Sequence, residues 1–356
     1  MRFFRFVVCA AALGVVACDD AGTEVILAPD EPLAHTRFVN VVPDTGGQDW
    51  RFVDDIENSP VGLNVQFRGF TPYQATTPGA RPLRVFPTTS DIHVTSTRLI
   101  DTTLTFEAGQ YYTIVHMGLA RPGGAVENRV VLLQDDAPDA ITAGNFALRA
   151  MHLGTGWGDI DVYGATSTSA AYPGSELFTD VSFQSVTNYR EVAVGGLALR
   201  ALPVGEVTSL RSLANTVAQT GEPGVDEDNL EPIGGTEMPG SAMLAIFTPG
   251  SVVGSSAPQG AAFVRTTSDT TLFATATGYA RTEGSFISNG FFVGQQITVD
   301  GFANAQNNGT SVITDVTALT LTVTKTGGTT PEVATKEARI RGPRPAWVYL
   351  VDKHPR

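Results

Sequence analysis

The side chains best suited to chemistry are carboxylates that gather in two short stretches. One stretch holds five within fourteen residues: Asp44, Asp49, Asp54, Asp55 and Glu57. The other holds Asp226, Glu227, Asp228 and Glu231 within six residues. Hard oxygen ligands at close range suit Ca²⁺, which makes Asp226, Asp228 and Glu231 weak calcium candidates. Neither stretch has EF-hand spacing, so the favoured interpretation is two solvated acidic loops, with no metal and no cofactor.

Histidines and nucleophiles show no catalytic arrangement. No two of the five histidines are spaced i, i+4, as metal-binding pairs on a helix are. His116 and His152 lie in apolar, strand-like runs, which predicts structural histidines with satisfied hydrogen bonds. The stretch Gly250–Gly254 is the nearest approach to G-x-S-x-G, but its serine is misplaced. The sequence therefore predicts a protein without catalytic residues, and a carboxylate-based hydrolase is the less favoured alternative.

Both cysteines, Cys9 and Cys18, lie in the first 18 residues. Two arginines precede an apolar run from Phe6 to Ala17, which is the plan of a secretory signal and is too short to span a bilayer. The segment from Val15 to Cys18 resembles a bacterial lipobox, which implies that Cys18 is the lipidated first residue of the mature chain. We therefore expect a signal peptide over 1–17 and a lipid anchor and tether over 18–34. The alternative is an ordinary cleaved signal with an incidental cysteine.

Beyond the tether, the chain consists of short runs rich in β-branched and aromatic residues, bounded by Gly, Pro, Asp or Asn. Strands are predicted over Arg37–Val42, Leu63–Phe67, Leu83–Phe86, Tyr111–Met117 and Arg129–Leu133. The best helical stretch is Val207–Val217, which predicts one short helix. Many short strands of this kind favour an all-β fold built from β-sandwiches.

A hidden repeat organises these strands. Residues 65–87 and 181–203 share eight identities in 23 positions at an offset of 116, among them Tyr73/Tyr189 and Gly79/Gly195. This indicates two copies of one domain. The endings Val131–Asp135 and Val348–Asp352 also correspond, but at an offset of 217, so about a hundred residues have been added to the second copy. We expect copy one over 35–140, and copy two over 145–264 and 343–356.

Most of the added length is a block at 265–342 with its own composition. Two of the three lysines, Lys325 and Lys336, lie in it, together with several asparagines. Strands are predicted over Thr271–Thr275, Gln296–Val299, Ser311–Val316 and Leu319–Thr324. Such a change inside a hairpin favours an inserted β module over a long decorated loop. Phe291, Phe292 and Phe302 are a possible binding patch, although module core is the more favoured interpretation of all three.

Two resemblances sharpen this organisation. The segments Thr36–Asp44, Phe106–Ile114 and Gly158–Tyr163 resemble the bacterial family named "domain of unknown function 4397", although Gln48–Val53 departs from its pattern. The family implies tandem Ig-like or transthyretin-like β-sandwiches on secreted or lipid-anchored envelope proteins, with no catalytic residues to transfer. The stretch Gly290–Asn304 resembles small β modules of phage tail and virion proteins, which implies a compact decoration or adhesion unit.

The net charge of the chain limits the classes of partner that it can bind. A formal net charge of −13 argues against tracking nucleic-acid phosphates. The leading hypothesis is a non-enzymatic, lipid-anchored cell-envelope protein on the extracytoplasmic side of a bacterial membrane. It would present β domains for adhesion, scaffolding or binding of a protein or carbohydrate partner. The alternative is a periplasmic sensor or assembly lipoprotein with a protein partner.

Overall fold

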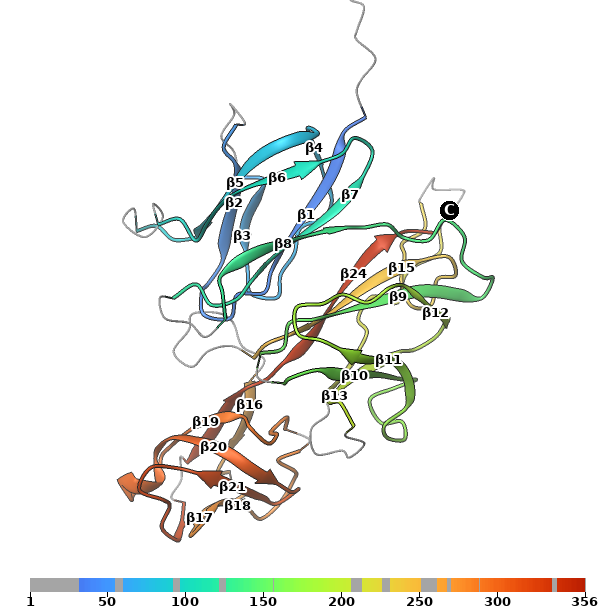
Figure 1. Cartoon of the computed structure of the whole chain (residues 1–356). Coiled ribbons are helices and arrows are strands. Elements are labelled where there is room, and N and C mark those ends of the chain that lie inside the picture. Colours follow the sequence, from blue (N-terminus) through green and yellow to red (C-terminus); the bar gives the residue numbers. More distant parts are fainter. Residues whose placement is uncertain are drawn as a thin grey trace, which may run out of the picture. The chain divides into compact units, whose positions relative to one another are not determined.

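The computed structural model describes residues 32–355, apart from 55–59, 92–96, 122–125, 156, 206–212, 226–230, 251–260, 268–269, 288 and 335–337. The chain is all-β, as the sequence predicts, and Leu33–Arg356 forms one compact unit (Figure 1). The helical element in the described part of the chain is one 3₁₀ turn, Ala305–Asn307. No helix among the described residues has the length and apolarity needed to cross a membrane.

The first sandwich is built from eight strands in two sheets (Figure 1). One sheet has the order β4-β1-β7-β8 and the other the order β3-β2-β5-β6. Strands β1 and β7 are parallel neighbours, with Phe38 opposite Ile114. The strands are β1 (Ala34–Asn40), β2 (Gln48–Phe52), β3 (Gly62–Val65), β4 (Gln74–Thr76), β5 (Gly79–Pro87), β6 (Ile100–Phe106), β7 (Tyr111–Met117) and β8 (Arg129–Gln134).

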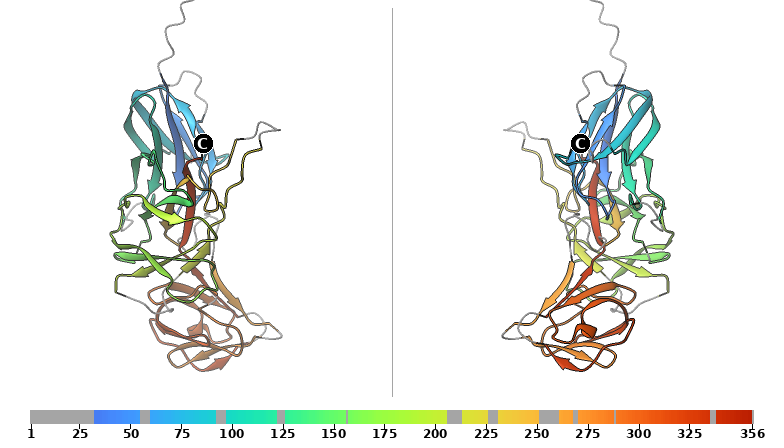
Figure 2. Two further views of the ribbon diagram at one scale, coloured as in Figure 1. Left: turned by 90° about the vertical axis from the view of Figure 1, so that its right-hand side faces the viewer. Right: turned by 90° about the vertical axis from the view of Figure 1, so that its left-hand side faces the viewer.

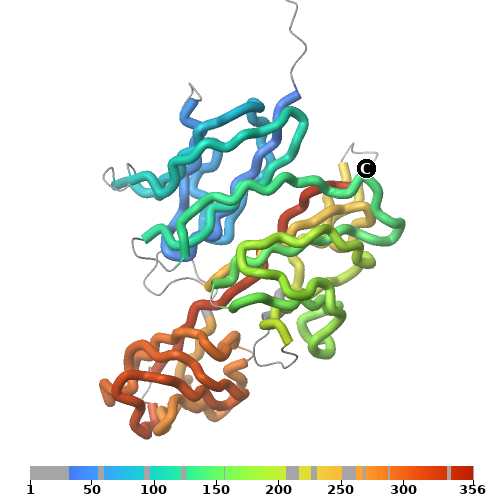
Figure 3. Tube along the Cα trace, viewed as in Figure 1, coloured from blue at the N-terminus to red at the C-terminus, as the bar shows by residue number. Residues whose placement is uncertain are grey.

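The second sandwich repeats this topology strand for strand. Its sheets have the orders β12-β9-β15-β24 and β11-β10-β13-β14, and the central β9 and β15 are again parallel. Figure 3 follows the chain through these strands in green and yellow until it returns in red as β24. The strands are β9 (Asn145–His152), β10 (Ile160–Ala165), β11 (Ser175–Val181), β12 (Arg190–Ala193), β13 (Ala198–Pro203), β14 (Leu213–Thr216), β15 (Ala242–Thr248) and β24 (Ala346–Lys353).

The short helix predicted over Val207–Val217 is wrong where the chain is described. Leu213–Thr216 is strand β14, which pairs antiparallel with β13 through Leu213↔Ala201. The remainder, 207–212, lies outside the described residues. Pairing with a neighbouring strand overrides a weak local helical pattern, because each added ladder bond satisfies a backbone group that would otherwise be left unpaired.

Three clusters of buried apolar residues stabilise the two sandwiches. Two of them are the cores of the individual sandwiches, and the third lies between the sandwiches. Phe38 belongs to the core of the first sandwich, while its neighbour Val39 belongs to a separate cluster shared with the second sandwich. The shared cluster joins Val115 of β7 to Leu244 and Ile246 of β15. Because side chains alternate across a strand, these central strands bury both faces, and β15 is buried at every position. The outer faces of sheets β4-β1-β7-β8 and β12-β9-β15-β24 therefore pack together.

The inserted block, strands β16–β23 between β15 and β24, forms one eight-stranded sheet with its own core (Figure 2, orange to red). Its order is β16-β23-β19-β20-β21-β18-β17-β22. Its strands are β16 (Ala261–Arg265), β17 (Leu272–Thr275), β18 (Gly278–Arg281), β19 (Gln296–Asp300), β20 (Gly309–Val316), β21 (Thr320–Thr324), β22 (Glu332–Val333) and β23 (Arg339–Pro343). The sheet begins four residues before the expected start, because Ala261 pairs with Pro343.

Both connections to the block leave from paired strands. Thr248, the last residue of β15, is the register partner of Ala346, the first residue of β24. On the block side, β16 and β23 are again antiparallel partners. The chain therefore enters the block after β15 and leaves it before β24. We call these two connecting segments the crossings.

Candidate functional site

Four charged residues lie buried where the two sandwiches meet, and we call them the charge cluster: Arg37, Asp135, Arg149 and Asp352. Arg37 is on β1 and Arg149 is on β9, both on the strand face that turns away from their own sandwich core. Asp135 follows β8, and Asp352 is near the end of β24. The arginine side chains are 4% exposed and the two carboxylates are fully buried.

The ion pairs of the charge cluster cross from one sandwich to the other. Arg37 of the first sandwich donates to Asp352 of the second, and Arg149 of the second donates to Asp135 of the first. Arg149 also donates through Nε to Asp352 at 3.0 Å. Two positive and two negative charges make the charge cluster formally neutral, so its buried charges compensate one another.

Two tyrosines complete the cluster in matching positions. Tyr73 donates its hydroxyl hydrogen to Asp135 at 2.7 Å, and Tyr189 donates to Asp352. Each ring also lies beneath an arginine of its own sandwich: Arg37 is 4.5 Å from the Tyr73 ring centre, and Arg149 is 4.8 Å from that of Tyr189. Each carboxylate is thus held by a tyrosine from its own sandwich and an arginine from the other.

Burial and the neighbouring charges shift the pKa of several of these groups. Burial lowers the pKa of both guanidinium groups, but the facing carboxylates outweigh it, and the pKa of Arg37 and Arg149 lies above the ordinary value. Burial, reinforced by the charge of Asp352, raises the pKa of Asp135. Burial also raises the pKa of Tyr73 and Tyr189, which remain hydrogen-bond donors. The charge cluster therefore links the two sandwiches through buried ion pairs.

Arg68 makes a second connection between the sandwiches. It occupies the turn after β3 in a left-handed backbone conformation, with φ of 65°. Its guanidinium donates to Thr248 Oγ1 at 2.9 Å, to the Pro249 carbonyl at 2.7 Å and to the carbonyl of Arg344. Burial and the nearby Arg344 charge lower the pKa of Arg68 to about 10. A residue of the first sandwich therefore binds both chain crossings that lead to the inserted block.

The sites predicted from the sequence are mostly dispersed or lie outside the described chain. Cys18, Asp226 and Asp228 are outside the described residues, and Glu231 is exposed. Among the residues described, no three histidines, cysteines or carboxylates gather as a metal site would require. The described carboxylates of the acidic stretch near residue 49 have separate partners: Asp44 accepts from the backbone of Ala120 and Arg121, and Asp49 accepts from the backbone of Asn64 and the hydroxyl of Thr88.

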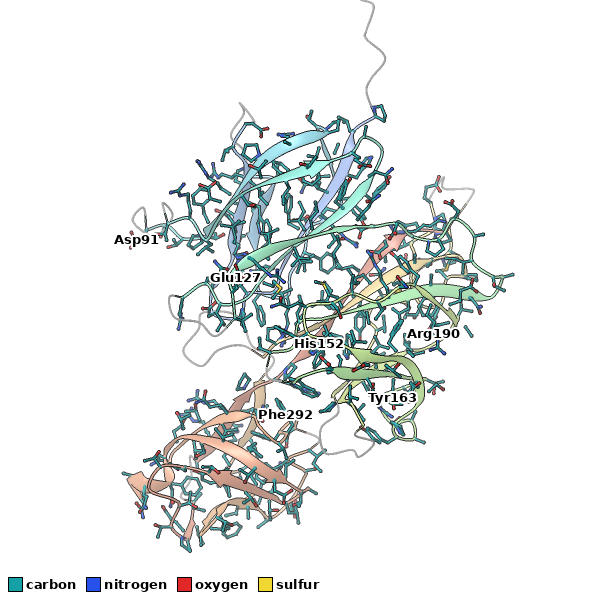
Figure 4. The ribbon with its side chains drawn as sticks, in the orientation of Figure 1. Asp91, Glu127, His152, Tyr163, Arg190 and Phe292 are labelled. Atoms are coloured by element: carbon teal, nitrogen blue, oxygen red, sulfur yellow. The ribbon has the colours of Figure 1, made fainter. Side chains whose placement is uncertain are left out.

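The two apolar histidines are structural, as predicted. His116 is fully buried, and its ring nitrogens lie 2.9 Å from Gln48 Oε1 and 2.7 Å from Asn128 Oδ1. Burial lowers the pKa of His116 to about 4. His152 is also buried, and its Nε2 lies 2.6 Å from the carbonyl of Gly158 (His152 is labelled in Figure 4).

The favoured interpretation of the three phenylalanines as module core holds for Phe291 and Phe302, and the possible binding patch is reduced to Phe292. Phe291 and Phe302 are 2% and 4% exposed and belong to the core of the inserted block, where they cannot reach a ligand at the surface. Phe292 points away from that core, is half-buried, and packs 5.3 Å from the ring centre of Trp157 in the second sandwich (Phe292 is labelled in Figure 4). Phe291 and Phe292 are neighbours in the chain, but the first belongs to the core of the block and the second is half-buried at its edge.

A cavity of about 240 Å³ lies beside this contact. Its described walls come from three parts of the chain: the second sandwich, the two crossings and the inserted block. The lining residues are Thr155, Trp157, Pro203, Gly250, Phe292, Val293, Gly294, Gln295, Gln296, Pro343 and Pro345. Sequence reasoning missed this cavity, because Trp157 and Phe292 are 135 positions apart and no local pattern relates them.

Comparison with known families bears on the first sandwich. Residues 34–163 match the family described as "Domain of unknown function (DUF4397)". The matched segment covers β1 to β8 and continues through β9 into β10. No curated protein matches the chain.

The match includes several of the positioning residues. Arg37, Asp135 and Arg149 fall inside the DUF4397 segment, whereas Asp352 falls outside it. The repeat in the sequence contained a signal for the charge cluster, since Tyr73 corresponds to Tyr189 and Asp135 to Asp352. What the sequence did not show is that the ion pairs cross between the two sandwiches.

Proposed function

We propose that this chain is a non-enzymatic, lipid-anchored protein of the bacterial cell envelope that presents its β domains to a ligand. In this proposal the two sandwiches are copies of one DUF4397 domain, and the inserted block is a module carried by the second copy. Cys18 supplies the anchor and residues 19–34 the tether. The unit from Leu33 onward supplies the presenting body.

The observation that carries the proposal is the way the sandwiches are joined. Eleven buried apolar residues form the cluster between them, and the charge cluster is embedded beside it. Domains of one chain ordinarily move relative to each other unless their interface is large and apolar. A joint of this kind favours a rigid support over a hinged catalytic cleft.

The chemistry of the cavity agrees with binding rather than reaction. Its described lining residues carry neither acidic, basic nor thiol side chains. The buried carboxylates Asp135 and Asp352 are engaged by arginines and tyrosines within the interface. General acid–base catalysis needs a titratable group within hydrogen-bond reach of the substrate.

The anchor is tested by labelling bacterial cells that express the full chain with a palmitate analogue. We expect the wild type to be labelled and to stay with the membranes after a high-salt wash, and Cys18→Ala to lose both properties. Cys9→Ala is the matched control, because Cys9 lies within the expected signal peptide and should leave labelling unchanged. Labelled Cys18→Ala protein would disprove lipidation at this residue.

Presentation is tested by adding protease to intact cells and to cells with a permeabilised outer membrane. Cleavage in intact cells supports display on the outer surface. Cleavage only after permeabilisation would overturn surface presentation and favour the periplasmic sensor or assembly protein.

A further inference from the structure

The cavity beside Trp157 and Phe292 has the properties of a ligand site. We infer that it binds one or two rings of a neutral saccharide, with one face of a ring stacked on Trp157. This inference deepens the proposed function by naming the ligand class. It depends on the proposed function only in assuming that the chain presents this cavity to a ligand outside the cell membrane.

The first argument is that packing holds the side chain of Trp157, which lines the cavity, in one position. The Trp157 ring packs edge-on against Phe247 at 5.0 Å, and Phe247 packs against Trp347 at 5.1 Å. Phe247 is fully buried, and a Cβ atom at Gly154 would lie 2.4 Å from its ring. The glycine therefore lets the loop carrying Trp157 lie directly on the core of the second sandwich. A ring fixed in this way loses little freedom when a ligand binds.

The opposite wall is fixed by Gln295. Its side chain is buried, its Nε2 donates to the Pro343 carbonyl at 2.7 Å, and its Oε1 accepts from the backbone of Phe292 at 3.4 Å. These bonds tie the segment before β19 to the end of β23. The cavity is thus bounded by a loop of the inserted block that is bonded to the returning crossing.

The second argument is charge. All eleven described lining residues are neutral in a chain with a formal net charge of −13. A phosphorylated or carboxylated ligand would meet no cation in the described lining, and a cationic ligand would meet no carboxylate there. Buried, unpaired charge is costly, so such a lining selects neutral ligands.

The third argument is size and mixed polarity. About 240 Å³ lies just below the range of about 300–1,000 Å³ typical of drug-sized ligands. The lining pairs apolar rings and prolines with the hydroxyl of Thr155 and the exposed amide of Gln296. A sugar ring presents the same combination, with an apolar face of C–H groups and an edge of hydroxyls. Aromatic side chains of this kind combine an apolar face with fixed geometry at modest entropic cost.

The chain offers a direct optical test, because the other two tryptophans, Trp50 and Trp347, are 0% and 4% exposed. The emission of the full chain is titrated with N-acetylglucosamine, diacetylchitobiose, maltose and cellobiose. Glucosamine and glucose 6-phosphate are the cationic and anionic counterparts. We expect a saturable change with at least one neutral sugar, and binding at least about tenfold weaker for the charged sugars, which is about 1.4 kcal/mol.

Variants are compared by calorimetry, because removing Trp157 removes the fluorescent reporter. We expect Trp157→Ala and Gln296→Ala each to weaken sugar binding, with about tenfold or more lost for Trp157→Ala, as for a central aromatic contact. Gln296 is exposed, so its variant keeps the test valid if Trp157→Ala fails to fold. Phe70→Ala, an aromatic 50% exposed on the first sandwich, is the matched control and should bind as the wild type does.

Three results would overturn the inference. They are no response to any neutral sugar at millimolar concentration, equal binding of the charged sugars, and unchanged binding by both cavity variants. A proline-rich peptide that changes Trp157 emission where sugars do not would assign the cavity to a peptide instead. None of these results bears on lipidation or surface exposure, which the cell experiments measure separately.

Discussion

Arg37 in the first sandwich donates a hydrogen bond to Asp352, which lies 315 residues further along the chain in the second sandwich. The converse pair, Arg149 with Asp135, runs in the opposite direction between the same two domains. Each sandwich therefore supplies the counter-ion that the other needs. The first sandwich alone would leave Arg37 without Asp352, whereas the second alone would leave Arg149 without Asp135 but still paired with its own Asp352.

Removing one carboxylate from the charge cluster should strongly destabilise the folded chain. We expect Asp352→Ala to lower the free energy of unfolding by about 3–5 kcal/mol, because Arg37 and Arg149 would then be buried with one carboxylate between them. Urea denaturation of the full chain measures this loss. Asp136→Ala is the matched control, since the Asp136 side chain is 78% exposed and lies 3.9 Å from Arg149. Equal effects of the two substitutions would contradict a positioning role for the cluster.

The tyrosine hydroxyls should contribute less to the free energy of unfolding than the carboxylates do. Tyr73→Phe and Tyr189→Phe each keep the ring under its arginine but remove a donor to a buried carboxylate. We expect each to lower the free energy of unfolding by about 1.5–3 kcal/mol, the range for hydrogen bonds to charged groups. Tyr111→Phe, at a ring 42% exposed, serves as the control and should change little. A large difference between Tyr73→Phe and Tyr189→Phe would show that the two halves of the cluster are not equivalent.

Arg68 should hold the crossings to the first sandwich. In Arg68→Ala, the acceptors at Thr248 and Pro249 lose their donors. We expect faster amide hydrogen exchange at the end of β15 and the start of β24, with the core of the inserted block unchanged, because its own cluster is separate. Arg98→Ala, at a side chain 54% exposed, is the control. Exchange that rises equally throughout the chain would mean that Arg68 supports global stability instead.

His116 should make stability depend on pH. Its pKa in the folded chain, about 4, lies below the ordinary value of about 6.5. Between these two pH values the unfolded chain binds a proton at this histidine and the folded chain does not. Stability is then complete above about pH 6.5 and falls as the pH drops toward 4, by an amount on the order of 3 kcal/mol. We expect His116→Gln to flatten the profile of unfolding free energy in this window relative to the wild type. Identical slopes in the two proteins would contradict this assignment.

The sequence was informative where periodicity and repetition act locally. The strands near Tyr111 and Arg129 were predicted at or close to their observed bounds, because short runs rich in β-branched and aromatic residues between turn residues indicate strands. The helix near Val207 was wrong in its described part because strand pairing, a non-local interaction, decided the conformation. The charge cluster and the cavity escaped prediction for the same reason. A buried arginine beside apolar residues has the same local pattern whether its acceptor lies in its own domain or in the next.

The paired crossings at Thr248 and Ala346 also have a mechanical consequence. A pull on the inserted block reaches the adjacent ends of both strands of one hydrogen-bonded pair together, so the two strands share the tension and neither is peeled from the other. At the N-terminal end of the described unit, a pull along the chain would enter at β1, which is flanked by β4 and β7 and runs parallel to β7. Drawing β1 out along its axis loads the bonds of that ladder together. If the chain is held at its N-terminus and pulled at its block, the load therefore falls on several hydrogen bonds of these strand pairs at once.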